Sequence, residues 1–237
     1  MVYYNQNNYA NIPYPADGYP NATVKSGGCG VVCASMVVEN LTGTHFPPEQ
    51  SAQFAIKKRA RVSGGTDMKV LANALCAEFG LTVKTSDAMA EVLTEVGNGA
   101  IAIANTGGDR AGHMGVFSNG GHYVVVYGVD GKNLQILDPG LYSGKYNKPH
   151  RKAAIVTDNT LIKAPASLLD GDCANRAPRY YIFKKTETKA PEGPSEWAKE
   201  AWEKAAQKKI LDGTNPQGPL TREQMAVVLD RLKLLED

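Results

Sequence analysis

The chain has 237 residues, of which 43% are hydrophobic and 21% charged, so it is long enough for one main domain and a small appendage. The formal net charge is only +2, which excludes the basic footprint of a nucleic-acid-binding surface or of a polybasic membrane patch. No apolar run approaches the roughly 20 residues of a membrane span, and the first residues lack the features of a signal peptide. We therefore expect no membrane span and synthesis in the cytoplasm.

The cysteines form no CxxC pair, and the few histidines do not follow zinc-finger spacing. A disulfide framework is not expected in a chain of this size with a reducing origin. We therefore predict free thiols, no metal and no organic cofactor. Cys33, Cys76 and Cys173 are interpreted as packing residues.

Residues 3–26 are rich in Tyr, Asn, Pro and Gly, a composition that predicts an extended, loop-dominated arm. Apolar side chains then recur at helical spacing in several segments. Proline start signals at Pro47 and Pro48, and glycine stop signals at Gly43 and Gly80, delimit these segments. The predicted helices cover residues 29–41, 47–58, 67–79 and 87–95.

Short apolar segments follow the helices, and they predict strands at residues 100–104, 122–127, 134–137 and 179–184. Asp130 and Gly131 separate the second of these strands from the third and give a strong β-hairpin signal. Helices first and hairpin-linked strands afterwards predict an α+β fold with an antiparallel sheet. This main domain is predicted to span residues 1–186.

The last part of the chain differs in composition. Residues 187–194 contain no large apolar side chain and predict a linker. Residues 195–237 predict a small helical tail of two amphipathic helices, with Trp197 and Trp202 lining the first and a capping box at 221–224 opening the second. Because so short a segment buries too little core alone, we expect it to pack on the main domain or on copies of itself.

Cys29 lies between two glycines at the point where the arm becomes the first predicted helix. A helix N-terminus favours negative charge, so a thiol placed there ionises more readily and becomes a usable nucleophile. Gly28 and Gly30 are predicted to let the backbone of a substrate approach closely. The alternative is a buried structural cysteine, which this setting favours less than it favours a nucleophile.

A cysteine nucleophile needs a base, and the base needs a group that orients it. His122 begins one strand of the predicted hairpin and Asp138 follows the end of the other, so strand pairing brings them together. A satisfied strand histidine and a turn-forming aspartate are the structural alternatives. The backbone N–H of Cys29 and the side chain of Gln6 are candidate donors to the oxyanion of acyl transfer.

His113 is the rival base. It lies in the glycine-rich loop 107–115, where it either lines a substrate cleft or is solvated. Gly121, directly before His122, is assigned to the same substrate-binding surface. His45 and His150 are predicted to be surface residues.

Several of these motifs together resemble the bacteriocin-leader-peptidase-like cysteine peptidases, family thirty-nine of the papain-fold clan. The resemblance rests on Gln6, the segment 28–36, the segment 121–126 and Asp138-Pro139, which occur in the family's order. It implies a papain-like cysteine peptidase domain over roughly residues 3–184. It also implies that Cys29 is the nucleophile, His122 the base and Asp138 its orienter, with Gln6 supporting the oxyanion.

The tail resembles a single S-layer-homology motif, through Trp197, the segment 210–213 and the segment 221–226. This resemblance implies binding to cell-wall polymers, with Trp197 and Arg222 as predicted contacts. Packing is the structural alternative for the tryptophans. Such motifs usually act in threes, so a single copy would act through a homo-oligomer formed by the tail helices.

Together the two resemblances predict a phage-type endolysin, a cysteine hydrolase that cleaves amide bonds in bacterial peptidoglycan. Such an enzyme accumulates in the cytoplasm and reaches the cell wall through a holin pore. Its predicted partners are peptidoglycan and a secondary wall polymer, and nucleic acid is not among them. The scissile bond stays open between the stem peptide, the cross-bridge and the muramoyl–alanine linkage. A protease with a protein substrate and a non-enzymatic wall-binding module are the alternatives.

Overall fold

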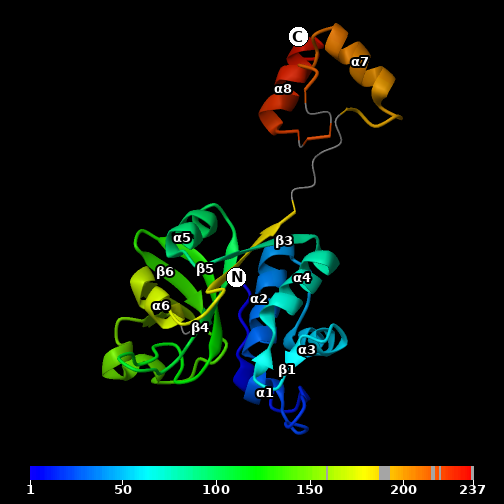
Figure 1. Cartoon of the computed structure of the whole chain (residues 1–237). Helices are drawn as coiled ribbons and strands as arrows, with labels where there is room; N and C mark the ends of the chain where they lie inside the picture. Colours follow the sequence, from blue (N-terminus) through cyan, green and yellow to red (C-terminus); the bar gives the residue numbers. More distant parts are fainter. Residues whose placement is uncertain (159, 187–192, 215–216, 219, 236–237) are drawn as a thin grey trace. The chain divides into compact units, whose positions relative to one another are not determined.

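The computed structural model describes residues 1–158, 160–186, 193–214, 217–218 and 220–235 of the chain. The chain divides into two compact units, Met1–Thr186 and Glu187–Asp237 (Figure 1). Of the predicted linker 187–194, residues 187–192 lie outside the described residues.

The first unit contains the helices expected in its N-terminal half: α2 (Cys29–Thr42), α3 (Pro48–Lys57), α4 (Met68–Phe79) and α5 (Met89–Gly97). Their ends follow ordinary capping chemistry. Pro48 is the first residue of α3, and the Asp67 side chain accepts a hydrogen bond at the start of α4. Gly43 and Gly80 end α2 and α4 in the left-handed conformation that glycine adopts most easily. The four predicted helices are confirmed.

The N-terminal arm contains only short helical pieces, η1 (Gln6–Asn8) and the single turn α1 (Val24–Gly27). The arm is nevertheless packed against the rest of the unit. Tyr14 is fully buried, and its hydroxyl forms a 2.8 Å hydrogen bond with Oγ1 of Thr66. The arm is therefore a fixed wall of the domain rather than a free extension.

Every strand pair in the described chain is antiparallel. The main sheet has seven strands in the order β3-β9-β4-β5-β6-β8-β7, and β1 pairs with β2 separately. The strands are β1 (Arg61–Val62), β2 (Gly65–Thr66), β3 (Leu81–Ser86), β4 (Ile101–Thr106), β5 (His122–Asp130), β6 (Asn133–Leu137), β7 (Ile155–Thr157), β8 (Leu161–Pro165) and β9 (Tyr180–Lys185). Asp130 pairs with Asn133, so the predicted hairpin between β5 and β6 is confirmed, as is the α+β class.

The central strands are buried on both faces of the sheet. Val125 of β5 enters a core shared with α2, α3 and α4, whereas Val124 and Val126 enter a second core with α5 and α6 (Ala166–Cys173). Figure 1 shows these two helix groups on opposite sides of the strands. Burial of each such valine contributes roughly 1.5–3 kcal/mol, so the alternation of side chains fixes which face of the sheet each side chain occupies and, with it, the register of the strands.

Sequence patterns did not predict β3, β7, β8 or α6. β3 and β7 are the two edges of the sheet, where one side faces solvent and apolar residues are fewer or exposed, such as Ile155. α6 is short and contains Gly171, which weakens its helical pattern. Two further turns, η2 (Lys145–Asn147) and η3 (Pro149–Arg151), lie in the loop after β6.

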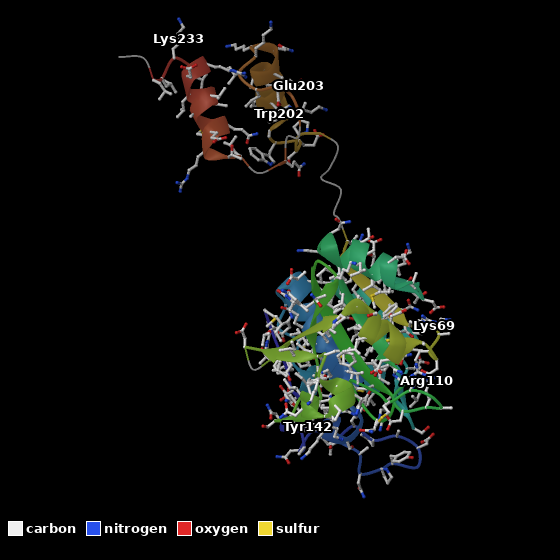
Figure 2. The ribbon with its side chains drawn as sticks, turned by 90° about the vertical axis from the view of Figure 1, so that its left-hand side faces the viewer. Lys69, Arg110, Tyr142, Trp202, Glu203 and Lys233 are labelled. Carbon is white, nitrogen blue, oxygen red and sulfur yellow. The ribbon has the colours of Figure 1, made fainter. Side chains whose placement is uncertain are left out.

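The second unit contains α7 (Lys199–Gln207) and α8 (Arg222–Arg231). The predicted capping box is confirmed, because Thr221 and Gln224 exchange hydrogen bonds of 3.1 and 2.9 Å. None of its described residues is buried. Figure 2 shows Trp202 and Glu203 on one helix; Trp202 is half-buried, beside a groove that Ile210 also lines.

One prediction for this unit is wrong. Trp197 does not line the first helix: it precedes α7, and 90% of its surface is exposed. The helix starts two residues later than its apolar spacing suggested, so Trp197 falls outside the helical repeat. Across the ranges that the structure describes, no helix is long and apolar enough to cross a membrane.

Candidate active site

Cys29 is the first residue of α2 and is half-buried at the end of the arm. Burial opposes ionisation of its thiol. The hydrogen bond and charge of His122 outweigh this, helped by the backbone N–H groups of Tyr123 and Gly30, and the pKa of Cys29 lies below its ordinary value. The thiol is thus prepared to become a thiolate.

The two glycines beside Cys29 have a packing role. A Cβ on Gly28 would stand 2.5 Å from the carbonyl oxygen of Val24, and one on Gly30 would stand 2.7 Å from Cβ of Thr66. Only glycine fits at either position, because the protein's own atoms fill the space of a side chain. Contact of Gly28 and Gly30 with a substrate stays a prediction.

His122 is the first residue of β5 and lies close to the thiol of Cys29. Its Nε2 lies 2.7 Å from Oδ1 of Asp138, which leaves Nδ1 as the ring nitrogen available to the thiol. Burial lowers the pKa of His122, but Asp138 and Cys29 outweigh burial and raise the pKa to about 9. The imidazole is therefore held protonated beside a thiol that ionises easily.

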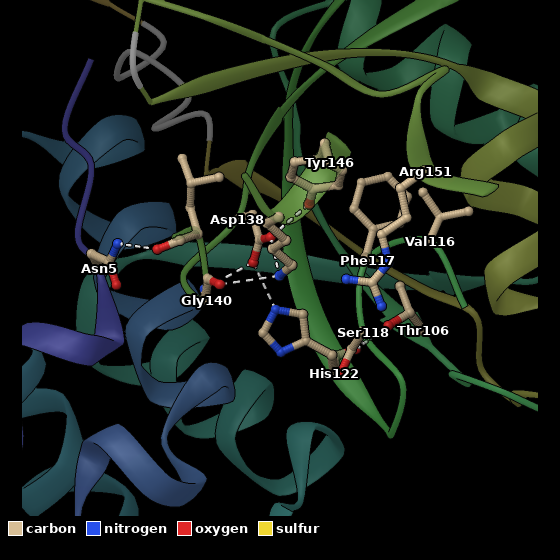
Figure 3. Close-up of polar contacts among 12 residues, drawn as sticks. Asn5, Thr106, Val116, Phe117, Ser118, His122, Asp138, Gly140, Tyr146 and Arg151 are labelled. Carbon is tan, nitrogen blue, oxygen red and sulfur yellow. Dashed lines mark hydrogen bonds and ion pairs between the residues drawn. The ribbon is translucent and has the colours of Figure 1, made fainter. Parts of the chain in front are cut away.

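Asp138 follows the last residue of β6 and is fully buried. Figure 3 shows its carboxylate among His122, Gly140 and Tyr146. The N–H of Gly140 donates to Oδ1 at 2.8 Å, and the hydroxyl of Tyr146 donates to Oδ2 at 2.6 Å. Burial alone would raise the pKa of Asp138, but the charges of His122 and Lys145 hold it well below its usual range.

Lys145 is a part of this site that the sequence did not reveal. Its buried ammonium group donates to Oδ2 of Asp138 and, at 3.1 Å, to the carbonyl oxygen of Gly140. Lysine in a loop after a strand is usually solvated, so composition carries no signal for burial. It lies seven residues after Asp138, and two turns return it to the carboxylate: the N–H of Leu141 donates to the carbonyl of Asp138 at 3.2 Å, and the N–H of Lys145 donates to the carbonyl of Tyr142 at 3.1 Å.

Gln6 connects the segment that follows Asp138 with the turn that precedes Cys29. Its backbone N–H donates to the carbonyl of Pro139 at 2.7 Å, and its Nε2 donates to the carbonyl of Lys25 at 3.1 Å. Its Oε1 is buried without a hydrogen-bond partner in the described chain. Gln6 thus bridges the residue after Asp138 and the turn that leads to Cys29, and its oxyanion role stays a prediction.

The structure places His113 with Asp172 of α6, not in solvent. Nε2 of His113 lies 2.6 Å from Oδ1 of the fully buried Asp172, and 25% of the His113 side chain is exposed. His122, not His113, is the histidine beside Cys29. Gly121 lies against Arg176, since a Cβ on this glycine would stand 2.7 Å from Nη2 of that side chain.

The other predicted positions are simply located. Cys33 and Cys173 are fully buried free thiols, and Cys76 is a half-buried one. His45 is exposed, and Arg222 is exposed at the first position of α8. Among the described residues, no group of three His, Cys, Asp or Glu side chains could hold a metal ion.

In a cysteine peptidase, a thiol lies beside an imidazole, and a carboxylate holds that imidazole in place. Cys29, His122 and the buried Asp138 have this arrangement. Residues 20–153, more than half of the chain, match the Peptidase C39 family. The chain belongs to the Peptidase C39 family and is a cysteine peptidase. The matched residues include Cys29, His122 and Asp138, whereas Gln6 precedes them.

A solved C39-like peptidase from Bacillus anthracis is similar, with a TM-score of 0.47 and 14% sequence identity over 74% of this chain and 96% of that chain. The curated proteins contain no match to this sequence.

Proposed function

We propose that the enzyme hydrolyses amide bonds through a thioester on Cys29, with His122 as general base and acid and Asp138 as the group that orients His122. The observation that carries this proposal is the position of the His122 imidazole, which is hydrogen-bonded through Nε2 to Asp138 and lies near enough to Cys29 to lower the pKa of its thiol. Lys145 and Tyr146 fix the carboxylate, so the imidazole has one orientation.

The chemistry follows from this arrangement. The thiolate of Cys29 attacks the carbonyl carbon, and the backbone N–H of Cys29 and the Nε2 of Gln6 stabilise the oxyanion. The C–N bond then breaks as protonated His122 gives its proton to the leaving amine, which leaves a thioester. Water attacks the thioester while His122 takes its proton, and the acid and the Cys29 thiolate are released.

The proposed substrate is a peptide of bacterial peptidoglycan, as in an endolysin-type endopeptidase or amidase. What supports this choice is the second unit, whose sequence resembles a wall-binding motif and whose Trp197 and Arg222 are exposed and free to meet a polymer. The enzyme would then act at the cell wall after release through a holin pore. A protein substrate is the alternative, since the site itself does not select between the two.

Loss of turbidity of purified Gram-positive cell walls tests the substrate. We expect clearing by the wild type and none by Cys29→Ala, with new amino groups identified by mass spectrometry. Cys76→Ala is the matched control, because this thiol is half-buried on α4 and its burial raises its pKa to about 11. Absence of clearing on several wall chemistries, with Cys29 still readily alkylated, would favour a protein substrate. Full biological activity of Cys29→Ala would instead favour a non-enzymatic module.

Removal of residues 195–237 tests the role proposed for the tail. We expect this truncation to reduce wall association or oligomer size more than it reduces turnover of a soluble peptide. Size-exclusion chromatography with light scattering, together with a wall pull-down, measures both quantities. Unchanged mass and unchanged wall binding would contradict the proposal.

A further inference from the structure

Arg176, between α6 and β9, has a guanidinium group that donates no hydrogen bond to any residue that the structure describes. Its Nε is buried and has no hydrogen-bond acceptor among the described residues. Nearby Arg179, by contrast, donates to Oδ1 of Asp170 at 3.2 Å and to the carbonyl of Ala174 at 3.4 Å. A buried donor without an acceptor costs free energy, so an acceptor from outside the described chain would stabilise Arg176.

The guanidinium lies beside the candidate active site. A Cβ on Gly121 would stand 2.7 Å from Nη2 of Arg176, so the group covers the backbone directly before His122. Burial and the neighbouring Tyr181 raise the pKa of Tyr123, and the positive charge of Arg176 opposes this rise. The backbone N–H of Tyr123 in turn helps to lower the pKa of Cys29. The positive charge of Arg176 thus lies next to Gly121 and Tyr123, the residues on either side of His122 in the sequence.

Acidic side chains around this region are already engaged. Asp138 binds His122 and Lys145, and Asp172 binds His113. Asp67 caps α4 by accepting from the N–H of Val70 at 3.1 Å, and Asp170 binds Arg179. No carboxylate of the described chain accepts a hydrogen bond from Arg176. The acceptor that fits the planar fork of a guanidinium best is another carboxylate.

We infer that Arg176 binds a carboxylate of the substrate, on one of the two residues that precede the scissile bond. This inference rests on the proposed function of Cys29 and adds a substrate class to it: peptides with a free acid beside the bond that is cut. Peptides whose acid is amidated are then poorer substrates. The group binds substrate and takes no part in proton transfer.

Two matched pairs of irreversible chloromethyl ketones test this inference without knowledge of the natural substrate. The pairs are acetyl-Glu-Ala with acetyl-Gln-Ala, and acetyl-Ala-Glu with acetyl-Ala-Gln, so each pair differs only in a carboxylate against an amide. The rate of Cys29 alkylation is measured for the wild type and for Arg176→Met, Arg176→Lys and Arg179→Met. Thermal denaturation of each variant is measured in parallel.

In one pair, we expect the Glu reagent to react with the wild type roughly tenfold faster than the Gln reagent, the effect of one charge-assisted hydrogen bond. Arg176→Met brings this ratio close to one, and Arg176→Lys retains part of it because the charge remains. Added salt lowers the ratio in the wild type. Arg179→Met, whose guanidinium is bound to Asp170, leaves the ratio unchanged.

Equal Glu-to-Gln ratios in the wild type and Arg176→Met would overturn the inference. So would an equal fall of both rates together with a lower melting temperature, since that result marks a structural role. Failure of every reagent to label Cys29 in the folded wild type would overturn the proposed function, and the inference with it.

Discussion

The first unit contains two histidine–carboxylate pairs that are almost identical in local geometry. Nε2 of His122 lies 2.7 Å from Oδ1 of Asp138, and Nε2 of His113 lies 2.6 Å from Oδ1 of Asp172. Both carboxylates are fully buried. A search for paired histidine and aspartate alone would therefore find two candidate sites.

What differs is the surroundings of each carboxylate. Asp172 accepts from the backbone N–H groups of Val116 and Phe117 at 3.0 and 2.9 Å, and so fastens the loop before β5 to α6. Asp138 is held mainly by side chains, including the charged Lys145. The first arrangement fastens a loop, whereas the second holds the imidazole that we propose as the catalytic base.

The thiols differ in the same way. His122 and two backbone N–H groups lower the pKa of Cys29, whereas burial and Asp172 raise the pKa of Cys173 to about 12. Cys173 directly follows Asp172 in α6 and remains a thiol at physiological pH. A histidine–carboxylate pair thus becomes a reactive centre only where a thiolate is stabilised beside it.

Replacement of each histidine by alanine should separate the two pairs most clearly. His122→Ala should lower the rate of substrate hydrolysis by about 10²–10⁴-fold, the range for loss of a general acid–base residue. His113→Ala should lower the melting temperature but change the rate of hydrolysis little, because it leaves Asp172 buried with one partner fewer. Kinetics and thermal denaturation measure the two effects. If the two variants lost the same factor in the rate of hydrolysis, the proposed difference between the two histidine–carboxylate pairs would be wrong.

Lys145→Met should destabilise the protein by about 3–5 kcal/mol, the cost of breaking a buried ion pair. It should also raise the pKa of His122 above about 9, because the negative charge of Asp138 is then less compensated. Denaturant unfolding and the alkaline limb of the pH–rate profile report these changes. The double variant Lys145→Met/Asp138→Asn should recover stability without recovering activity. A destabilised double variant would show that Lys145 acts by packing alone.

The pH profile should show the charge state of the first pair. Below the lowered pKa of Cys29 the thiol is protonated, so hydrolysis is lost as pH falls through that value. Above about pH 9 His122 loses the proton that the leaving amine needs, so hydrolysis falls again. Alkylation of Cys29 should persist at high pH, because the thiolate remains. Parallel curves for alkylation and hydrolysis above that pH would contradict this assignment.

The smallest expected effect concerns the glycine beside each imidazole. A Cβ on Gly140 would stand 3.1 Å from Cε1 of His122, whereas one on Gly171 would stand 3.8 Å from Cε1 of His113. Gly140→Ala should therefore displace the His122 ring by a few tenths of an ångström and lower kcat severalfold, roughly up to tenfold. Gly171→Ala is the matched control and should leave kcat as it is. Equal kcat for the two variants would show that the ring tolerates displacement.

Much of the fold and part of the site could be predicted from the sequence. Helix caps such as Asp67 and Gly80 act locally, and the hairpin at Asp130 and Gly131 sets which strand ends meet. The juxtaposition of His122 with Asp138 followed from that hairpin, because both residues lie at its open end.

The parts of the fold and of the site that the sequence did not predict depend on long-range contacts, which produce no periodic pattern in the sequence. Lys145 becomes buried because a turn returns it to Asp138, and Asp172 meets His113 across 59 residues. The position of Arg176 over Gly121 is set by the approach of two separate loops. Strands at the sheet edges were missed because their side chains face solvent on one side.

The order of the strands in the sheet has a consequence for folding of the enzyme during its synthesis. β9 is the last strand of the first unit, yet it lies between β3 and β4 and is the only partner of β3 in the described sheet. A ribosome delivers Cys29, His122 and Asp138 long before residues 180–185. The nascent chain therefore carries the three residues that we propose as catalytic on a sheet that is still missing an inner strand. We expect it to stay inert until translation of the domain is complete, and we expect messages truncated before β9 to yield no active hydrolase inside the cell that makes them.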